Sequence, residues 1–249
     1  MSYVAPLLAL VVMEIILGID NIIFLSIVVS GLPAAQQGRA RAIGLGLALV
    51  ARLGLLLGIR VVMGLSTPLF HWSSIGWVPE GWVESHQVDA VTGRDLVLLL
   101  GGVFLVGKSV HEIHKKTSPD RAERESQAPK PSSFAGALAQ IVVLDLVFSL
   151  DSVISAIGMA QELWIMVVAM LAAVAFMALF AGKVSRFVDA NPTVQVLALA
   201  FLVLIGVMLV AEGMGTHVSK GYIYAAMAFA FVVELLNMRA RRHRSGQAA

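Results

Sequence analysis

The sequence predicts an all-α, polytopic membrane protein with seven transmembrane helices, built as an inverted 3+3 repeat plus one helix. Its composition is 58% hydrophobic and only 14% charged, whereas soluble domains carry about 25% charged residues. The apolar residues form seven long blocks, and a bilayer core needs about 20 such residues per helix. Lys and Arg concentrate in alternate loops and in the C-terminal tail, which predicts an external N-terminus and an internal C-terminus.

Seven spans follow from the hydropathy of the chain. They are residues 4–29, 43–65, 95–110, 134–160, 163–182, 194–211 and 221–237. The chain is thereby divided into a first half of three helices (1–116), a charged cytoplasmic linker (117–133), a second half of three helices (134–212), and a seventh helix with a basic tail (213–249). The outer loop 66–94 contains Trp72, Trp77 and Trp82, which indicates an amphipathic segment at the outer interface.

Two polar octets interrupt the first and fourth spans. EIILGIDN covers 14–21 and DLVFSLDS covers 145–152, with acids at the first and seventh positions of each. The two spans cross the bilayer in opposite directions, so spans one to three and four to six are candidate inverted repeats. Such repeats place a substrate site near the midplane, where the two halves meet.

The octets carry the candidate metal-binding residues. An ionised acid within a span costs about 2.5–3.5 kcal/mol, so these acids must be protonated, paired or metal-bound. Their oxygens suit hard divalent cations such as Mn²⁺, Mg²⁺ or Ca²⁺. A local helix break near Gly18 or Ser149 would let both acids of one octet reach one ion. The candidate ligands are Glu14, Asp20, Asn21, Asp145, Ser149, Asp151 and Ser152.

Other polar residues in or near the spans are candidates for the ion pathway or for counter-ions. Arg52 could pair with an acid of an empty site. Glu112 could instead form a helix-end ion pair with Lys108, and Glu212 could simply be solvated. Glu234 and Asn237 could line the pathway or form a polar cluster at a helix end. This second set comprises Arg52, Lys108, Glu112, Glu212, Glu234 and Asn237.

The octets and their flanking segments resemble the paired signatures of the TerC family of integral membrane proteins. The resemblance extends to RARAIGLGLALVARL, RDLVLLLGGVFLVGKSVHEIH, HVSKGYIYAAM and VVELLN, and so covers nearly the whole chain. It is strongest to short bacterial inner-membrane members that consist of the membrane domain alone. It implies a seven-helix fold and, from several relatives, export of manganese.

The most favoured function is therefore export of a divalent cation, Mn²⁺ first, with protons as a candidate coupling ion and the bilayer as the other partner. No permanently bound cofactor is expected, and a net charge of +2 does not suggest nucleic acid. One alternative is a non-transporting membrane factor that supports metalation or assembly of envelope proteins. A second alternative, an intramembrane aspartyl protease using Asp20 and Asp151, lacks the GxGD context.

Overall fold

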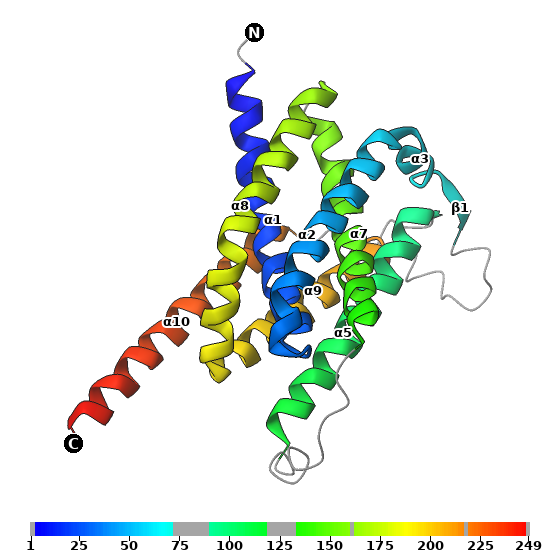
Figure 1. Cartoon of the computed structure of the whole chain (residues 1–249). Coiled ribbons are helices and arrows are strands. Elements are labelled where there is room, and N and C mark those ends of the chain that lie inside the picture. Colours follow the sequence, from blue (N-terminus) through cyan, green and yellow to red (C-terminus); the bar gives the residue numbers. More distant parts are fainter. Residues whose placement is uncertain (1–2, 72–89, 119–132, 160–161, 217–218, 248–249) are drawn as a thin grey trace.

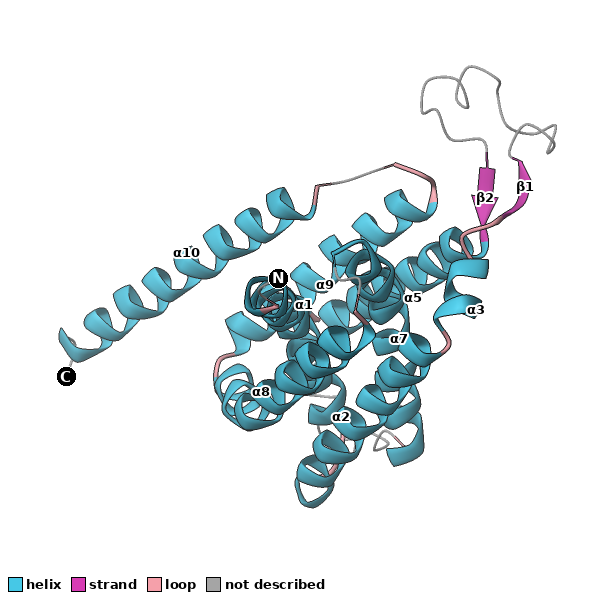
Figure 2. Ribbon diagram, turned by 90° about the horizontal axis from the view of Figure 1, so that it is seen from above, coloured by secondary structure: helices cyan, strands magenta, loops and turns pink. Residues whose placement is uncertain are grey.

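The computed structural model describes residues 3–71, 90–118, 133–159, 162–216 and 219–247. These residues form a helical bundle with a small hairpin at one edge (Figures 1 and 2). The elements are α1 (Val4–Ser30), α2 (Ala34–Leu57), α3 (Ile59–Gly64), β1 (Pro68–His71), β2 (Ala90–Thr92), α5 (Gly93–Thr117), α7 (Phe134–Met159), α8 (Leu163–Ala190), α9 (Pro192–Gly213) and α10 (Lys220–Gln247).

Six of these helices are long and apolar enough to cross a membrane: α1, α2, α5, α8, α9 and the Lys220–Arg241 part of α10. The apolar part of α7, Phe134–Leu150, is shorter than these six spans. The prediction of an all-α, polytopic membrane fold is confirmed. The two chain ends lie at opposite ends of the bundle in Figure 1, as an odd number of crossings requires. Seven crossings and their orientation remain predictions.

Several helices are longer than the spans expected from hydropathy. α2 begins at Ala34 rather than at residue 43, and it ends at Leu57, where Gly58 separates it from α3. α5 continues to Thr117 and α8 to Ala190, each about two turns beyond the expected end. Hydropathy marks the part of a helix that contacts lipid, whereas backbone hydrogen bonding continues into polar residues outside the bilayer.

Helix pairing follows a pattern that relates the two predicted halves. The most extensive contacts are α1 with α8, α2 with α7, and α5 with α9. If α1 is exchanged with α7, α2 with α8 and α5 with α9, the α1–α8 pair becomes the α2–α7 pair, and the α5–α9 pair is unchanged. The pairing agrees with an inverted repeat, which itself stays a prediction. α10 contacts mainly α9 and lies along the side of the bundle (Figure 2).

The α5–α9 pair packs backbone against backbone. A Cβ atom added at Gly102 would lie 2.7 Å from the carbonyl oxygen of Gly206, and one added at Gly206 would lie 3.0 Å from that of Gly102. Without a hydrophobic driving force between helices in lipid, such close contact supplies the van der Waals energy of association. The core around this pair includes Leu98, Leu105 and Leu202, each at most 1% exposed.

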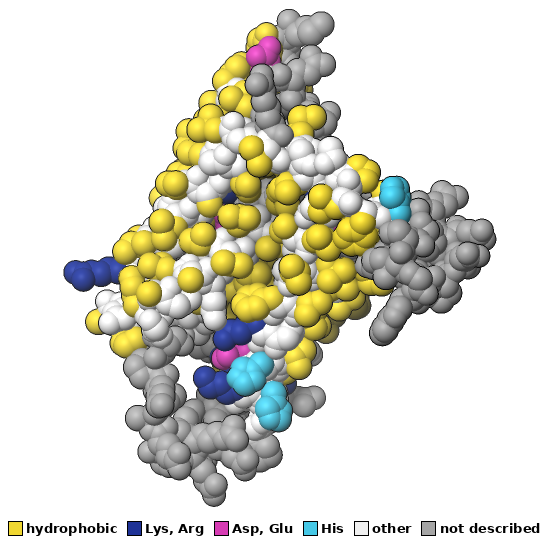
Figure 3. Space-filling model, turned by 90° about the vertical axis from the view of Figure 1, so that its right-hand side faces the viewer, with side chains coloured by type: hydrophobic (Ala, Val, Ile, Leu, Met, Phe, Trp, Pro, Cys, Tyr) yellow, Lys and Arg dark blue, Asp and Glu magenta, His cyan; other side chains and the backbone are white. Residues whose placement is uncertain are grey.

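The outer surface of the bundle is apolar. Leu57, Leu179 and Phe229 are each more than 70% exposed, as expected for side chains that face lipid. Figure 3 shows one such face, with basic, acidic and histidine side chains gathered near one end.

The loop 66–94 contains a two-stranded antiparallel sheet, in which Phe70 pairs with Val91 and His71 with Ala90. Thr92 then caps α5: its side chain accepts a hydrogen bond from the Asp95 backbone N–H, and the Asp95 carboxylate accepts one from the Thr92 N–H. The predicted amphipathic segment with its three tryptophans lies within 72–89, outside the described residues.

Candidate functional site

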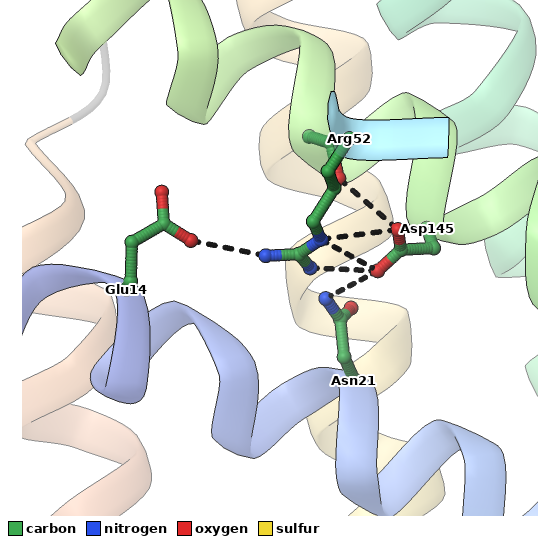
Figure 4. A network of polar contacts seen from close by, with 5 residues as sticks. Glu14, Asn21, Arg52 and Asp145 are labelled. Atoms are coloured by element: carbon green, nitrogen blue, oxygen red, sulfur yellow. Dashed lines mark hydrogen bonds and ion pairs between the residues drawn. The ribbon is translucent and has the colours of Figure 1, made fainter. Parts of the chain in front are cut away.

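A buried ionic network joins three helices at the level of the two octets. Arg52 of α2 donates from Nη1 to Glu14 Oε2 of α1 at 3.0 Å. It also donates from Nη2 to Asp145 Oδ1 of α7 at 2.6 Å, and from Nε to both Asp145 oxygens at 3.2 and 3.1 Å. All three side chains are nearly inaccessible, with 3% to 6% exposure. One guanidinium thus holds the first acid of both octets (Figure 4).

Two further octet residues complete the hydrogen bonding of Asp145. Asn21 donates from Nδ2 to Asp145 Oδ1 at 3.0 Å, and Ser149 donates from Oγ to Asp145 Oδ2 at 3.2 Å. Asp145 therefore accepts from Arg52 in the two-pronged geometry typical of strong arginine–carboxylate pairs, with an amide and a hydroxyl as additional donors. Both oxygens of this buried carboxylate are hydrogen-bonded, as burial of a charge requires.

The sequence of α2 explains how Arg52 reaches the other helices. Its buried residues recur at every fourth position, as Ala40, Gly44, Ala48, Arg52 and Leu56. The small members bring α2 close to its neighbours: a Cβ at Gly44 would lie 3.2 Å from side-chain atoms of Ile141 and Leu25. Arg52 continues this inward-facing stripe, and its long side chain crosses from α2 to both α1 and α7.

The expected helix break is absent, because α1 and α7 are continuous α-helices through Gly18 and Ser149. The octets meet instead through contacts between separate helices. Gly18 allows close packing: a Cβ there would lie 2.5 Å from the Met177 sulfur of α8. A small cavity of about 10 Å³ beside Glu14 is lined by Leu10, Val153, Met166, Ala169 and Met170.

The structure brings together four of the seven predicted metal ligands, Glu14, Asn21, Asp145 and Ser149, but around an arginine. The side chains of Asp20, Asp151 and Ser152 lie outside the described residues. Within the described part of the chain, no group of three or more Asp, Glu, His or Cys side chains could hold a metal ion. Of the three states open to a buried acid, Glu14 and Asp145 are paired, and Arg52 is the partner of both.

Lys108 and Glu112 line a second cavity, of about 300 Å³, between α1, α5, α7 and α9. Among the contacts of the described residues there is no Lys108–Glu112 ion pair, so the expected helix-end pairing is not formed. His111, Lys115 and Gln140 also line this cavity. On α1 the lining residue nearest the network is Phe24, about one turn beyond Asn21. The cavity thus approaches the network from the end where α1 joins α2.

The remaining candidates lie away from Arg52. Glu212 is 8% exposed, and its Oε2 lies 3.8 Å from Nη2 of Arg94, so the solvated interpretation was wrong. Arg94 lies at the end of the loop 66–94, and nothing in the sequence indicates that its partner is buried at the α5–α9 contact. On α10, Asn237 is exposed and Glu234 is partly buried. No described contact joins either to the network.

Fold and site together define a polytopic helical membrane protein with a network of an arginine and two acidic side chains buried inside its bundle. Its sequence matches the integral membrane protein TerC family over residues 2–248. The chain belongs to that family, which confirms the resemblance drawn from the octets.

Two of the relatives are close to this chain in length, and two are named inner membrane proteins. A UPF0053 protein of Haemophilus influenzae is 46% identical over 236 residues, covering 95% of this chain and 93% of the relative. The UPF0053 inner membrane protein YgdQ of Escherichia coli K12 is 46% identical over 229 residues, covering 92% and 90%. In YoaE of the same organism, 44% identity covers 96% of this chain and 43% of the relative. No solved structure gives a significant match. The protein is a multi-pass inner membrane protein.

Proposed function

We propose that this protein exports a divalent metal cation, Mn²⁺ first among the candidates, through a site between the two octet helices. The observation that carries the proposal is the convergence of Glu14 and Asp145 on one buried cation. These acids hold the same position in two matched octets on different helices. Because these two acids already hold the guanidinium of Arg52 between them, we infer that they could hold a metal ion in its place.

The chemistry of the side chains supports a hard or borderline divalent ion as substrate. The proposed ligands are oxygen donors: Glu14, Asp145 and Asn21, with Asp20, Asp151, Ser149 and Ser152 completing the set. Carboxylate, amide and hydroxyl oxygens are the ligands of Mn²⁺, Mg²⁺ and Ca²⁺. Met166 and Met170 of α8 line the small cavity beside Glu14, and the Met177 sulfur lies next to Gly18. A thioether contact with the ion would favour Mn²⁺ over Ca²⁺.

Transport would alternate access to this site. α1 and α7 each pair mainly with a helix of the other predicted half, so movement of one half against the other changes the spacing of Glu14 and Asp145. The cavity beside Lys108 and Glu112 approaches the site from one end of the bundle. Since carboxylates bind metal only when deprotonated, exchange of metal for protons would couple export to pH.

The test uses a variant in which the network keeps its shape and loses its charges. Glu14→Gln, Arg52→Gln and Asp145→Asn together remove two acids and one base, and so leave no buried ion unpaired. Everted inner membrane vesicles carrying the wild type should take up Mn²⁺ against a gradient, and vesicles with the triple variant should not. Whole cells should show the same contrast in manganese content by mass spectrometry.

A matched control is Asp189→Asn, which alters an exposed acid near the end of α8 and should leave uptake unchanged. Equal uptake by the wild type and the triple variant would rule out this site. Absence of uptake of Mn²⁺, Mg²⁺ or Ca²⁺ by wild-type vesicles would refute transport and favour the metalation-factor alternative.

A further inference from the structure

We propose that Arg52 is a tethered competitor of the transported cation. In this inference, which rests on the proposed function, its guanidinium fills the place between Glu14 and Asp145 whenever the metal is absent. Metal entry then requires the guanidinium to leave at least one of these carboxylates. Arg52 would thereby set the affinity of the site and keep binding weak enough for release.

The first argument is geometric. Arg52 contacts both acids through separate nitrogens, Nη1 toward Glu14 at 3.0 Å and Nη2 toward Asp145 at 2.6 Å. It therefore lies between the two carboxylates that a bridging metal would have to share. An ion bound directly by both carboxylates cannot occupy this place while both contacts remain.

The second argument is charge. In the deprotonated form that metal binding requires, Glu14 and Asp145 carry two negative charges, and Arg52 carries one positive charge. A divalent cation added beside a fixed guanidinium would place two cations within a few ångströms of each other, and in a buried setting their repulsion is costly. Arginine cannot escape by losing its proton, because its pKa lies above the physiological range. The remaining response is movement of the side chain.

The third argument concerns the alternative of a purely structural ion pair. If Arg52 only fastened α2 to α7, its contacts with Asp145 would suffice, since they already include three of its four hydrogen bonds. The additional contact to Glu14 draws in the equivalent acid of the other octet. Both octets therefore bind the same cation, as they must if one exchangeable metal ion is to bind between them.

The test is Mn²⁺ binding to the purified, full-length protein in detergent, followed by calorimetry and by the electron paramagnetic resonance signal of free Mn²⁺. Arg52→Gln should tighten binding by about tenfold or more, because it removes a repulsive charge a few ångströms from the metal. In transport assays the same variant should show a lower KM and a lower maximal rate, since tighter binding slows release. A purely structural role of Arg52 would not lower the KM together with the maximal rate.

Two companion variants keep the test interpretable. Arg52→Lys retains the charge and should bind Mn²⁺ much as the wild type does. Arg94→Gln makes the same change of net charge near Glu212, away from the network, and should leave Mn²⁺ affinity unchanged. Arg52→Gln removes the cation that Glu14 and Asp145 share, so the variant should also depend on Mn²⁺ for stability. It is therefore purified with Mn²⁺, which is removed by chelation immediately before titration.

Each outcome decides between the proposals. Tighter binding by Arg52→Gln, with Arg94→Gln unchanged, supports competition. Equal or weaker binding by folded Arg52→Gln, in a protein whose wild type binds and transports Mn²⁺, overturns the role of Arg52 and leaves the proposed function standing. No binding of Mn²⁺, Mg²⁺ or Ca²⁺ by either folded protein overturns both.

Discussion

Replacing Asp145 with Asn should destabilise the protein severely, although the two side chains have nearly the same shape. The substitution removes the negative charge that accepts three hydrogen bonds from Arg52 and one each from Asn21 and Ser149. Arg52 would then be buried with Glu14 as its one described acidic partner. Breaking a buried ion pair from one side costs about 3–5 kcal/mol. For a chain of this size that corresponds to a fall in Tm of about 6–20 °C.

The assay is thermal unfolding in detergent, followed by tryptophan fluorescence. The triple variant with Glu14→Gln, Arg52→Gln and Asp145→Asn is the informative comparison, because it leaves no ion unpaired. It should be more stable than Asp145→Asn alone, since neutral replacement of a whole buried network is often tolerated. The surface change Asp189→Asn should lie within about 0.5 kcal/mol of the wild type. If Asp145→Asn has the same Tm as the wild type, or a higher Tm than the triple variant, the argument from an unpaired buried arginine is wrong.

Three further predictions concern packing, capping and the edge of the network. Gly102→Ala should destabilise the α5–α9 contact by about 1–3 kcal/mol, because the new methyl would lie 2.7 Å from a carbonyl oxygen. The control Gly107→Ala, whose methyl would meet nothing within 4 Å, should keep the wild-type Tm, and equal Tm values for the two variants would contradict this packing. Thr92→Ala should cost about 1 kcal/mol by removing the cap of α5, measurable as a lower Tm, and an unchanged Tm would mean that the cap is not formed. Ser149→Ala removes one of five hydrogen bonds to Asp145 and should lower the free energy of unfolding by about 1 kcal/mol. If Mn²⁺ uptake by this variant fell as far as in the charge-free triple variant, Ser149 would do more than support Asp145.

The class of protein and the octet residues that meet in the buried network could be singled out from the sequence because both signals are local. Long apolar blocks identify membrane helices without any knowledge of their partners. Acids inside those blocks are costly enough to indicate a function. The match between the octets at 14–21 and 145–152 requires only a comparison of two short strings.

Helix ends were predicted less well, because hydropathy and helical hydrogen bonding stop at different residues. The early start of α2 at Ala34 lies in a polar stretch, AAQQGRARA, that hydropathy excludes. A break in the octet helices was considered because one straight helix cannot aim Glu14 and Asp20 at one ion. The structure satisfies Glu14 from another helix instead, so α1 needs no break.

The sequence by itself therefore determined that this is a multi-pass membrane protein with acidic octets, and it supplied Arg52 as one of several candidate counter-ions. Only the tertiary structure decided that Arg52 pairs with both Glu14 and Asp145, while Glu212 pairs with Arg94 instead. Arg52 and Asp145 are 93 positions apart. Their contact depends on how α2 and α7 are rotated against each other, which small residues such as Gly44 permit. Hydropathy reports the preference of each residue for lipid, whereas the pairing of buried charges depends on distances between helices that no local pattern contains.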